Sequence, residues 1–353
     1  MSIFDQKVIK YEMKPLSSLE KVFPDETPVY RMECQMLSGL WGETVSFQVA
    51  YTGDFVMRER LDVRIVSELA EHVHVRTVEM VPVGRATNGI VDDNYLKTTS
   101  GLYPDLLKDL KDGKVIVYSR QWRSLWVDVD ITNEIPAGEY EIELQLIKEG
   151  EVVCNAKQKV TVIGTELPKL DIMHTEWMHA DCLADYYHVE VFSEEHWKLL
   201  ENYFQEYVKR DCNMMLTPLF TSPLDTAIGL ERTTCQLIDV EVKDGEYVFG
   251  FENLKRWINL CKKCGIEYFE MSHLFSQWGA KYAPKVVATV NGKKEKIFGW
   301  HTPAVGEYTK FLESFLPQLT AKLREWEIAD VTYFHISDEP REEHLESYKA
   351  AKE

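Results

Sequence analysis

Apolar and polar positions alternate with a period of two along the first 165 residues of the chain. The alternation is clearest in six segments, residues 44–49, 61–65, 74–78, 125–129, 140–146 and 158–162. Side chains that alternate in this way point to opposite faces, so each segment is a candidate half-buried strand. Turn residues such as Pro136 and Gly150 separate neighbouring strands, whereas residues 103–110 have a helical spacing and predict a short helix. The pattern predicts an N-terminal β-sandwich domain over residues 1–165.

The pattern changes at residues 164–168, which we interpret as a domain boundary. Beyond it, short apolar runs alternate with segments whose apolar positions recur every three or four residues. Strands are expected near residues 170–174, 213–216, 266–271 and 330–336. Helices are expected after Ser193, from Leu254 to Gly265, over 308–323 and from Pro340 onward. Alternating strands and helices predict a parallel sheet with right-handed crossovers.

The long segments at 217–250 and 275–304 follow expected strand ends, and they favour a (β/α) barrel with substrate-binding loops over an open doubly wound sheet. No glycine-rich phosphate loop follows any expected strand. A complete barrel takes roughly 250 residues, but only four strands are expected. We therefore predict that residues 166–353 form the N-terminal half of a (β/α)8 catalytic barrel. The expected fold class is multidomain β and α/β, a β-sandwich followed by a partial TIM-type barrel.

A half-barrel has consequences for behaviour in solution. Its open sheet would expose an edge strand and an apolar face, so we expect self-association if the barrel is incomplete. We also expect the isolated chain to be inactive if strands that belong to the site are missing from it.

Charge and cysteine usage narrow the class of protein. The chain has 58 acidic and 40 basic residues, a formal net charge of −18, which argues against nucleic-acid and membrane-surface binding. The N-terminus lacks the apolar core of a signal peptide, and no apolar run approaches the ~20 residues of a membrane span. Seven dispersed cysteines favour free thiols in a reducing compartment, so we expect a cytoplasmic protein.

No metal or other cofactor is expected from the cysteine and histidine spacings. Cys261 and Cys264 form the one C-x-x-C pair, and no second pair or histidine partner is spaced to complete a metal site. A metal hydrolase that uses His174, His179 and His188 is disfavoured because their spacing includes no i, i+4 pair.

Candidate chemistry gathers where the expected strands end, which is where parallel α/β folds place their sites. These positions carry carboxylates, imidazoles, indoles and short polar side chains, namely His174, Glu176, Trp177, His179, Asp181, Asn213, Thr217, Glu270, His273, Trp278, His335, Asp338 and Glu339. Indole faces stack on the CH faces of sugars, and a carboxyl pair supplies acid and base for glycoside hydrolysis. Each aromatic or histidine residue taken alone is equally consistent with a core position. Their clustering favours a carbohydrate site.

Asp338 and Glu339 are the sharpest candidates. An acidic pair before a proline is also a common start of a helix. Its position directly after the expected strand 330–336 favours a pair of catalytic carboxylates.

Four short motifs give the chain a resemblance to glycoside hydrolase family 123 and its relatives. They are PAGEY at residues 136–140, HTEW at 174–177, FSQWGA at 275–280 and SDEP at 337–340. The resemblance implies a β-sandwich followed by a (β/α)8 barrel that removes terminal β-linked N-acetylgalactosamine. It also implies a substrate-assisted retaining mechanism, in which the 2-acetamido oxygen of the substrate attacks the anomeric carbon. This mechanism is an exception to the two-carboxylate rule.

The resemblance assigns distinct roles to the acidic pair. Glu339 would protonate the leaving oxygen and later activate water, and Asp338 would hold the acetamido N–H and stabilise the forming positive charge. For the rest of the substrate site we expect Trp177 and Trp278 to wall the sugar pocket. The remaining expected substrate-binding residues are Asp181, Asn213 and His335.

Two other functions fit the same residues. A two-carboxylate glycosidase of other specificity would use Glu176 or Glu270 as nucleophile opposite Glu339. A non-catalytic carbohydrate-binding protein could use the same scaffold, because fold alone does not decide function.

Overall fold

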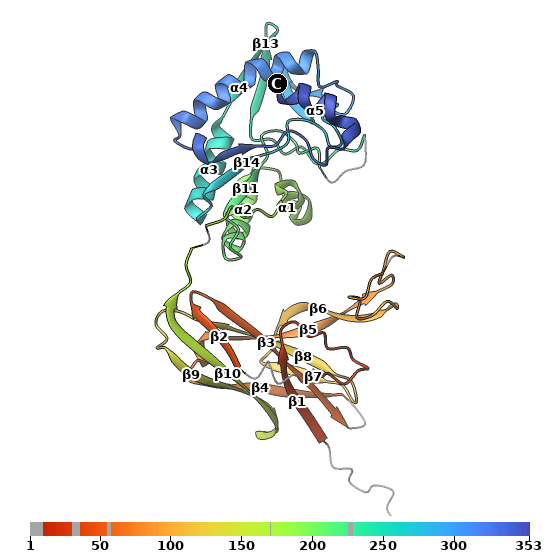
Figure 1. Cartoon of the computed structure of the whole chain (residues 1–353), viewed down its shortest axis with the longest axis vertical. Helices are drawn as coiled ribbons and strands as arrows, with labels where there is room; N and C mark the ends of the chain where they lie inside the picture. Colours follow the sequence, from red (N-terminus) through yellow and green to blue (C-terminus); the bar gives the residue numbers. More distant parts are fainter. Residues whose placement is uncertain (1–9, 30–35, 55–57, 90, 170, 225–228) are drawn as a thin grey trace, which may run out of the picture. The chain divides into compact units, whose positions relative to one another are not determined.

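The structure is a computed structural model that describes residues 10–29, 36–54, 58–89, 91–169, 171–224 and 229–353 (Figure 1). The chain forms two compact units, Met1–Lys169 and Leu170–Glu353, and each has a hydrophobic core of its own. No helix in the described ranges is both long enough and apolar enough to cross a membrane.

The first unit consists of two β-sheets. In its described residues the first sheet has five strands, in the order β1 (Lys10–Ser17), β3 (Thr44–Asp54), β8 (Arg123–Asp130), β5 (Val73–Val83) and β6 (Gly101–Asp109). The second, counted over the same residues, also has five, in the order β2 (Met36–Trp41), β10 (Glu151–Glu166), β9 (Gly138–Lys148), β4 (Glu59–Val66) and β7 (Lys114–Val117). Neighbouring strands are antiparallel, except that β2 runs parallel to β10.

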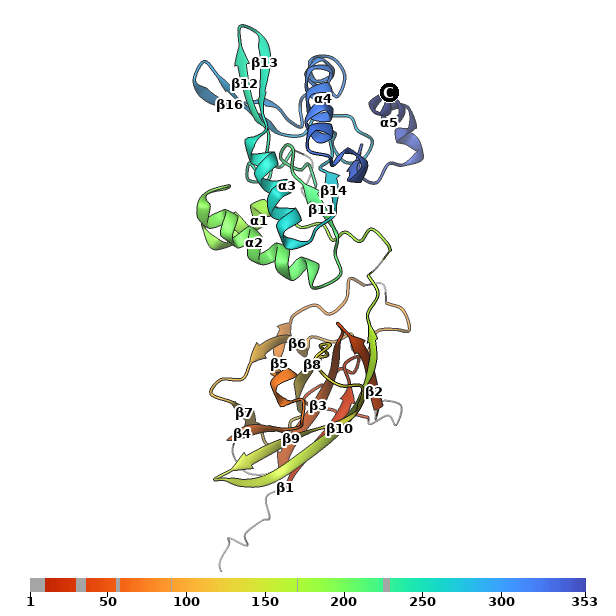
Figure 2. The same cartoon turned by 90° about the vertical axis from the view of Figure 1, so that its left-hand side faces the viewer.

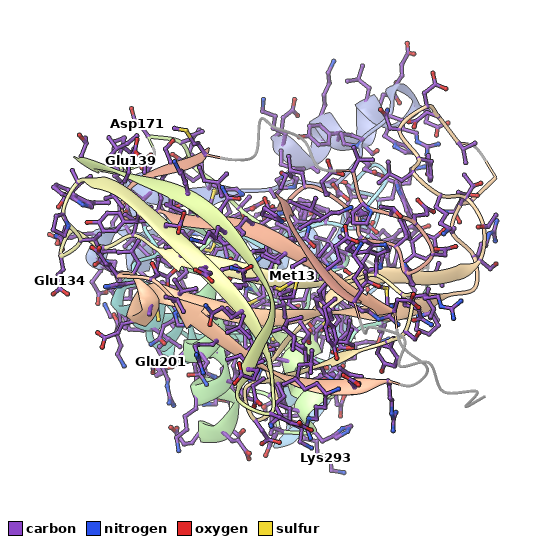
Figure 3. All side chains as sticks on the ribbon, turned by 90° about the horizontal axis from the view of Figure 1, so that it is seen from below. Met13, Glu134, Glu139, Asp171, Glu201 and Lys293 are labelled. Carbon is purple, nitrogen blue, oxygen red and sulfur yellow. The ribbon has the colours of Figure 1, made fainter. Side chains whose placement is uncertain are left out.

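Both sheets contribute side chains to one core, as a sandwich requires. On β8 the residues Leu125, Val127 and Val129 alternate inward and are fully buried. Leu144 of β9 and Met13 of β1, which is labelled in Figure 3, belong to the same core. The period-two pattern of the sequence therefore identifies the inward face of β8 and β9.

The helix expected at 103–110 is not formed. These residues lie largely in β6, which pairs antiparallel with β5 from Gly101 opposite Val83 to Asp109 opposite Arg76. Backbone hydrogen bonds to β5 outweigh the local helical spacing of the apolar positions, because tertiary context overrides a weak local preference. Leu106, which is part of that spacing, and Leu102 just before it are about half exposed.

The second unit has a small parallel sheet at its centre. Within the described residues it has three strands in the order β11 (Met214–Thr217), β14 (Tyr268–Met271) and β17 (Thr332–Phe334). The connections contain α3 (Glu252–Cys264) and α4 (Glu307–Glu325), and α2 (Glu194–Val208) precedes β11 (Figure 1). Ser193 caps α2 by accepting the His196 N–H at 3.2 Å, and Gly265 ends α3 with a φ of +101°. Three of the four expected strands and these three helices are thus present.

The first expected strand, at 170–174, is not present among the described residues. Residues 171–179 have no regular secondary structure and lead into α1 (Ala180–Tyr187). The Asn213 side chain accepts the His174 N–H at 2.8 Å and donates to the Ile172 carbonyl at 2.9 Å. The Asn213 amide thus bonds the backbone N–H and C=O groups that would otherwise pair with a neighbouring strand. Asparagine side chains compete with regular secondary structure in this way.

The long connections contain strands that the sequence pattern did not indicate. Two hairpins, β12 (Asp239–Lys243) with β13 (Glu246–Gly250) and β15 (Val286–Val290) with β16 (Lys293–Phe298), join through parallel pairing of β12 and β15. They make one sheet in the order β13-β12-β15-β16, and Figure 2 labels β12, β13 and β16. The segments expected as open loops are therefore partly ordered by a sheet of their own.

The C-terminal helix begins later than expected. Pro340 is followed by a 3-10 turn, Glu342–His344, and α5 spans Leu345–Lys352.

Strand β17 is an edge of the parallel sheet as far as the structure describes it, and its residues Tyr333 and Phe334 are 40% and 44% exposed. Such an edge is where another strand would add.

Removal of a core side chain tests the sandwich. Leu144→Ala deletes a fully buried side chain and should lower the free energy of unfolding by about 2–5 kcal/mol. Leu102→Ala, at a position 47% exposed, should change it by less than about 0.5 kcal/mol. Urea unfolding followed by circular dichroism measures both. Equal effects of the two substitutions would contradict the packing described above.

Candidate active site

The loop that follows β14 is tied to the residues that follow β17. Ser337, which is buried, donates through its hydroxyl to the Ser276 carbonyl at 2.9 Å and accepts the Ala280 N–H at 3.2 Å. The Trp278 N–H donates to the Asp338 carbonyl at 3.1 Å. Both segments leave the C-terminal ends of neighbouring parallel strands, so these bonds bring residues 60 positions apart in sequence into one structure.

The two acidic side chains are each held by a neutral donor from this loop. Gln277 donates through Nε2 to Asp338 Oδ2 at 3.0 Å, and Trp278 donates through Nε1 to Glu339 Oε2 at 3.2 Å. Neither carboxylate forms an ion pair with another described residue. Asp338 is half-buried and Glu339 is exposed. The pair is therefore oriented without being neutralised, and Glu339 is accessible to a ligand.

The backbone around the pair has an unusual conformation. Glu339 and Trp278 have φ values of +45° and +57°, which a non-glycine residue adopts at a cost of about 1–3 kcal/mol. Gly279 has a φ of +105°, and a Cβ there would lie 2.6 Å from the His344 ring. Only glycine permits this approach of the loop to the 3-10 turn. The loop that holds Asp338 and Glu339 is thus specified by backbone geometry as well as by hydrogen bonds.

A second cluster, made of Trp177, Glu270, His273 and His335, forms at the same strand ends. Trp177 donates through Nε1 to Glu270 Oε2 at 3.1 Å, and its ring meets those of His273 and His335 edge-on at 5.3 and 6.0 Å between centroids. The two imidazole centroids are 3.9 Å apart. Glu270 and His273 are buried, whereas Trp177 is 37% exposed. The cluster combines a carboxylate with two imidazoles beneath a partly exposed indole.

Burial sets the charge state of His273. Desolvation, with a smaller contribution from the nearby His335 and His179, lowers the pKa of His273 to about 3. Its imidazole is therefore neutral at physiological pH, with one nitrogen as donor and the other as acceptor.

Asp181 and Asn213, both expected to bind sugar hydroxyls, have structural partners instead. Both Asp181 carboxylate oxygens pair with Arg232, at 2.8 and 3.2 Å, and both side chains are buried. Asn213 precedes β11 and lies at the N-terminal end of the sheet, so its expected place among the strand-end site residues is wrong. Its amide is occupied by the segment that ends at His174. The structure groups neither residue with Asp338 and Glu339.

Two residues that position the acidic pair were not singled out from the sequence. Gln277 acts through its hydrogen bond to Asp338, and Ser337 acts through hydrogen bonds to the loop after β14. Neither type of side chain suggests catalysis. The one available signal was their place inside the FSQWGA and SDEP motifs. The sequence places His273 and Glu270 near a strand end, and it predicts a more specific role only for Glu270, as an alternative nucleophile.

Two cavities of the second unit are lined by residues other than the acidic pair. A cavity of about 1110 Å³ is bordered by the four-stranded sheet and residues such as Phe192 and Lys294. Another, of about 610 Å³, lies between α4 and α5 and is bordered by Phe275 and Ala280 of the loop described above. Neither is lined by Asp338 or Glu339. Among the described residues, no group of three or more His, Cys, Asp or Glu side chains is arranged to hold a metal ion.

Comparison with known proteins identifies the second unit. Residues 177–353 match the family model described as glycoside hydrolase 123, catalytic domain. A family 123 glycoside hydrolase from Clostridium perfringens, solved to explain glycolipid glycan hydrolysis, aligns with a TM-score of 0.70 at 14% identity. The alignment covers 97% of this chain and 60% of that one, so this chain spans about three fifths of the solved protein.

More distant comparisons add little. A β-glucosidase from Listeria innocua aligns over 45% of this chain and 17% of its own, with 10% identity and a TM-score of 0.21, which carries no argument about this protein. No curated protein matches the sequence.

The lowered pKa of His273 predicts a pH dependence of stability. Between its unfolded pKa of about 6.5 and its folded value of about 3, only the unfolded chain binds the proton, so stability falls as the pH falls. The loss from this residue at pH 5 is about 2 kcal/mol. Wild type should therefore lose about that much more stability than His273→Phe between pH 8 and pH 5. Urea unfolding at both pH values measures the difference, and identical losses would refute it.

Proposed function

The chain belongs to glycoside hydrolase family 123, and on this premise we propose that it removes a terminal β-linked N-acetylhexosamine, N-acetylgalactosamine above all, from a carbohydrate or glycoconjugate. The observation that carries the proposal is the pair Asp338 and Glu339, each oriented by one neutral donor and neither bound in an ion pair with a described residue. The relative from Clostridium perfringens acts on glycolipid glycans, which is consistent with a glycoconjugate substrate.

The proposed reaction is substrate-assisted and retaining. The 2-acetamido oxygen of the sugar attacks the anomeric carbon while Glu339 gives its proton to the departing oxygen. Asp338 accepts the acetamido N–H and stabilises the positive charge of the cyclic intermediate through its own negative charge. Glu339 then takes a proton from water as the water oxygen attacks the anomeric carbon. The bond from this carbon to the acetamido oxygen breaks, which opens the cyclic intermediate with net retention. Exposure of Glu339 supports this role, because both the leaving group and the water must reach it.

The sheet β11-β14-β17 is proposed to belong to a (β/α)8-type barrel. Its strands are parallel and neighbour one another in the order in which they occur along the chain. Helices lie in the connections between them, and the acidic pair follows the C-terminal end of β17. In such a barrel, strands added beyond the edge of β17 would enclose the open side of the site. Trp278 and Trp177 are proposed as walls of the sugar pocket, and His335 as a substrate-binding residue.

A two-carboxylate glycosidase is the second candidate function, and one observation favours Glu270 as its nucleophile. Glu270 is buried at the strand ends and accepts the Trp177 indole N–H. Glu176, the other carboxylate considered, is exposed and lies 3.6 Å from His174. A fixed, desolvated carboxylate is the better nucleophile of the two.

Substitution of the acidic pair tests the reaction. Glu339→Gln should lower kcat/KM on an aryl β-N-acetylgalactosaminide by about 10²–10⁴-fold, because the general acid and base is lost. Asp338→Asn should lower it by about 10²–10³-fold through loss of the stabilising charge. Glu342→Gln, an exposed position three residues away, is the matched control and should retain wild-type turnover. Normal rates in both pair variants would end the proposal.

A thiazoline derived from N-acetylgalactosamine separates the two candidate mechanisms. It mimics the cyclic intermediate, so a substrate-assisted enzyme should bind it more tightly than the parent sugar, as transition-state mimics do by about 10²-fold or more. A two-carboxylate enzyme should show no such preference, and Glu270→Gln should then abolish turnover. Competitive inhibition constants for both compounds decide between the mechanisms.

A further inference from the structure

Two histidines meet just beyond the ends of neighbouring strands. His273 follows β14 by two residues and His335 follows β17 directly, so the parallel register brings them together. Their rings are 3.9 Å apart between centroids at an interplanar angle of 69°. Trp177 packs edge-on against both. The pair lies at the strand ends that also lead to the acidic pair.

The imidazoles keep polar atoms buried without partners. Both ring nitrogens of His273, which is 1% exposed, and Nδ1 of His335 have no hydrogen-bond partner among the described residues. Buried polar atoms are paired in the great majority of cases, and an unpaired one costs free energy. An aromatic hydrocarbon ring would fill this space without that cost. Polar atoms retained here therefore point to a ligand.

His196 shows how this protein treats a buried histidine that only supports the fold. It is fully buried, its Nδ1 accepts the Phe192 N–H at 2.9 Å, and its Nε2 bonds the Ala180 carbonyl at 3.0 Å. Both nitrogens of His196 are thus partnered, whereas neither nitrogen of His273 is. The comparison separates a structural role from a binding role within one chain.

We propose that His273 is a substrate-binding residue which, together with His335, binds one hydroxyl group of the sugar. This inference rests on the proposed function and extends it to a residue outside the acidic pair. A hydroxyl both donates and accepts hydrogen bonds, and a neutral imidazole offers one donor and one acceptor nitrogen in return. The carboxylate of Glu270 adjoins the same indole, so an anionic group would be repelled there. A neutral hydroxyl is the ligand that fits.

Trp177 controls access to the imidazoles. It is the exposed member of the cluster, at 37%, and its indole N–H makes one hydrogen bond, to Glu270. In the proposed complex the Trp177 side chain moves aside, giving up its hydrogen bond to Glu270 and its edge-on contacts with both imidazoles. The sugar hydroxyl then becomes the polar partner of His273 and His335.

The matched substitutions His273→Phe and His196→Phe test the inference. His273→Phe should keep a melting temperature at pH 8 at or above that of wild type, because no hydrogen bond is lost. It should nevertheless lower kcat/KM on an aryl β-N-acetylgalactosaminide, and weaken N-acetylgalactosamine binding in calorimetry, by about 10–100-fold. His196→Phe loses two hydrogen bonds and should lower the melting temperature with little change in sugar affinity. A melting temperature that falls equally in both variants, with unchanged affinity in His273→Phe, would overturn the inference.

Deoxy substrates identify the hydroxyl. The 3-, 4- and 6-deoxy analogues of the substrate are compared in wild type and His273→Phe. The penalty of the substitution should vanish for one analogue and persist for the other two, and a penalty that persists for all three would refute hydroxyl binding. Wild type that neither binds nor cleaves any of these sugars would instead refute the proposed function. Wild type that binds while His273→Phe binds equally well would refute this inference alone.

Discussion

The tie between the loop after β14 and the residues after β17 is the constraint on which the proposed site depends. Ser337 links Ser276 to Ala280, and the Trp278 N–H is bonded to the Asp338 carbonyl. These bonds hold Trp278 and Glu339 in left-handed conformations that an unconstrained loop would avoid. The backbone strain at these two residues is tolerated because the same hydrogen-bonded loop orients the side chains of Asp338 and Glu339.

Neutral donors recur at the carboxylates proposed for function. Gln277 and Trp278 bond Asp338 and Glu339, and Trp177 bonds Glu270. Asp181, in contrast, is paired with an arginine. The arginine adds a full opposite charge to its carboxylate, whereas an amide or indole N–H contributes one neutral hydrogen bond that orients the side chain. The type of partner therefore separates the carboxylates proposed for function from one that is held in a buried ion pair.

The buried histidine cluster adds a second contrast between stability and function. A fold optimised for stability alone would fill the space beside Trp177 with an apolar ring. Three buried imidazole nitrogens without partners in the described part of the chain lie on two adjacent rings here, and each such group calls for an explanation, which a bound ligand would supply. The acidic pair is thus proposed to carry out the reaction, and the imidazoles are proposed to bind the sugar.

Patterns among residues that are close in the chain are enough to predict most of its local elements and the position of its acidic pair. Alternation marks the inward face of β8, helical spacing marks α2, α3 and α4, and the acidic pair follows a strand as expected. Each of these depends on residues close in sequence, which is why a pattern predicts them. The strand β6 in place of a helix and the sheet of two hairpins depend on pairing with distant segments. No local pattern contains that information.

The partners of individual polar side chains were likewise decided only by the tertiary structure. Asp181 and Asn213 are residue types that often bind sugar hydroxyls. In the structure, however, Asp181 pairs with Arg232, and Asn213 is hydrogen-bonded to the segment before α1. Gln277 and His273 acquire their importance from residues about 60 positions away. A carboxylate, amide or imidazole can serve structure or binding equally well. Which role it takes depends on the atoms that folding places beside it, and those come from distant parts of the chain.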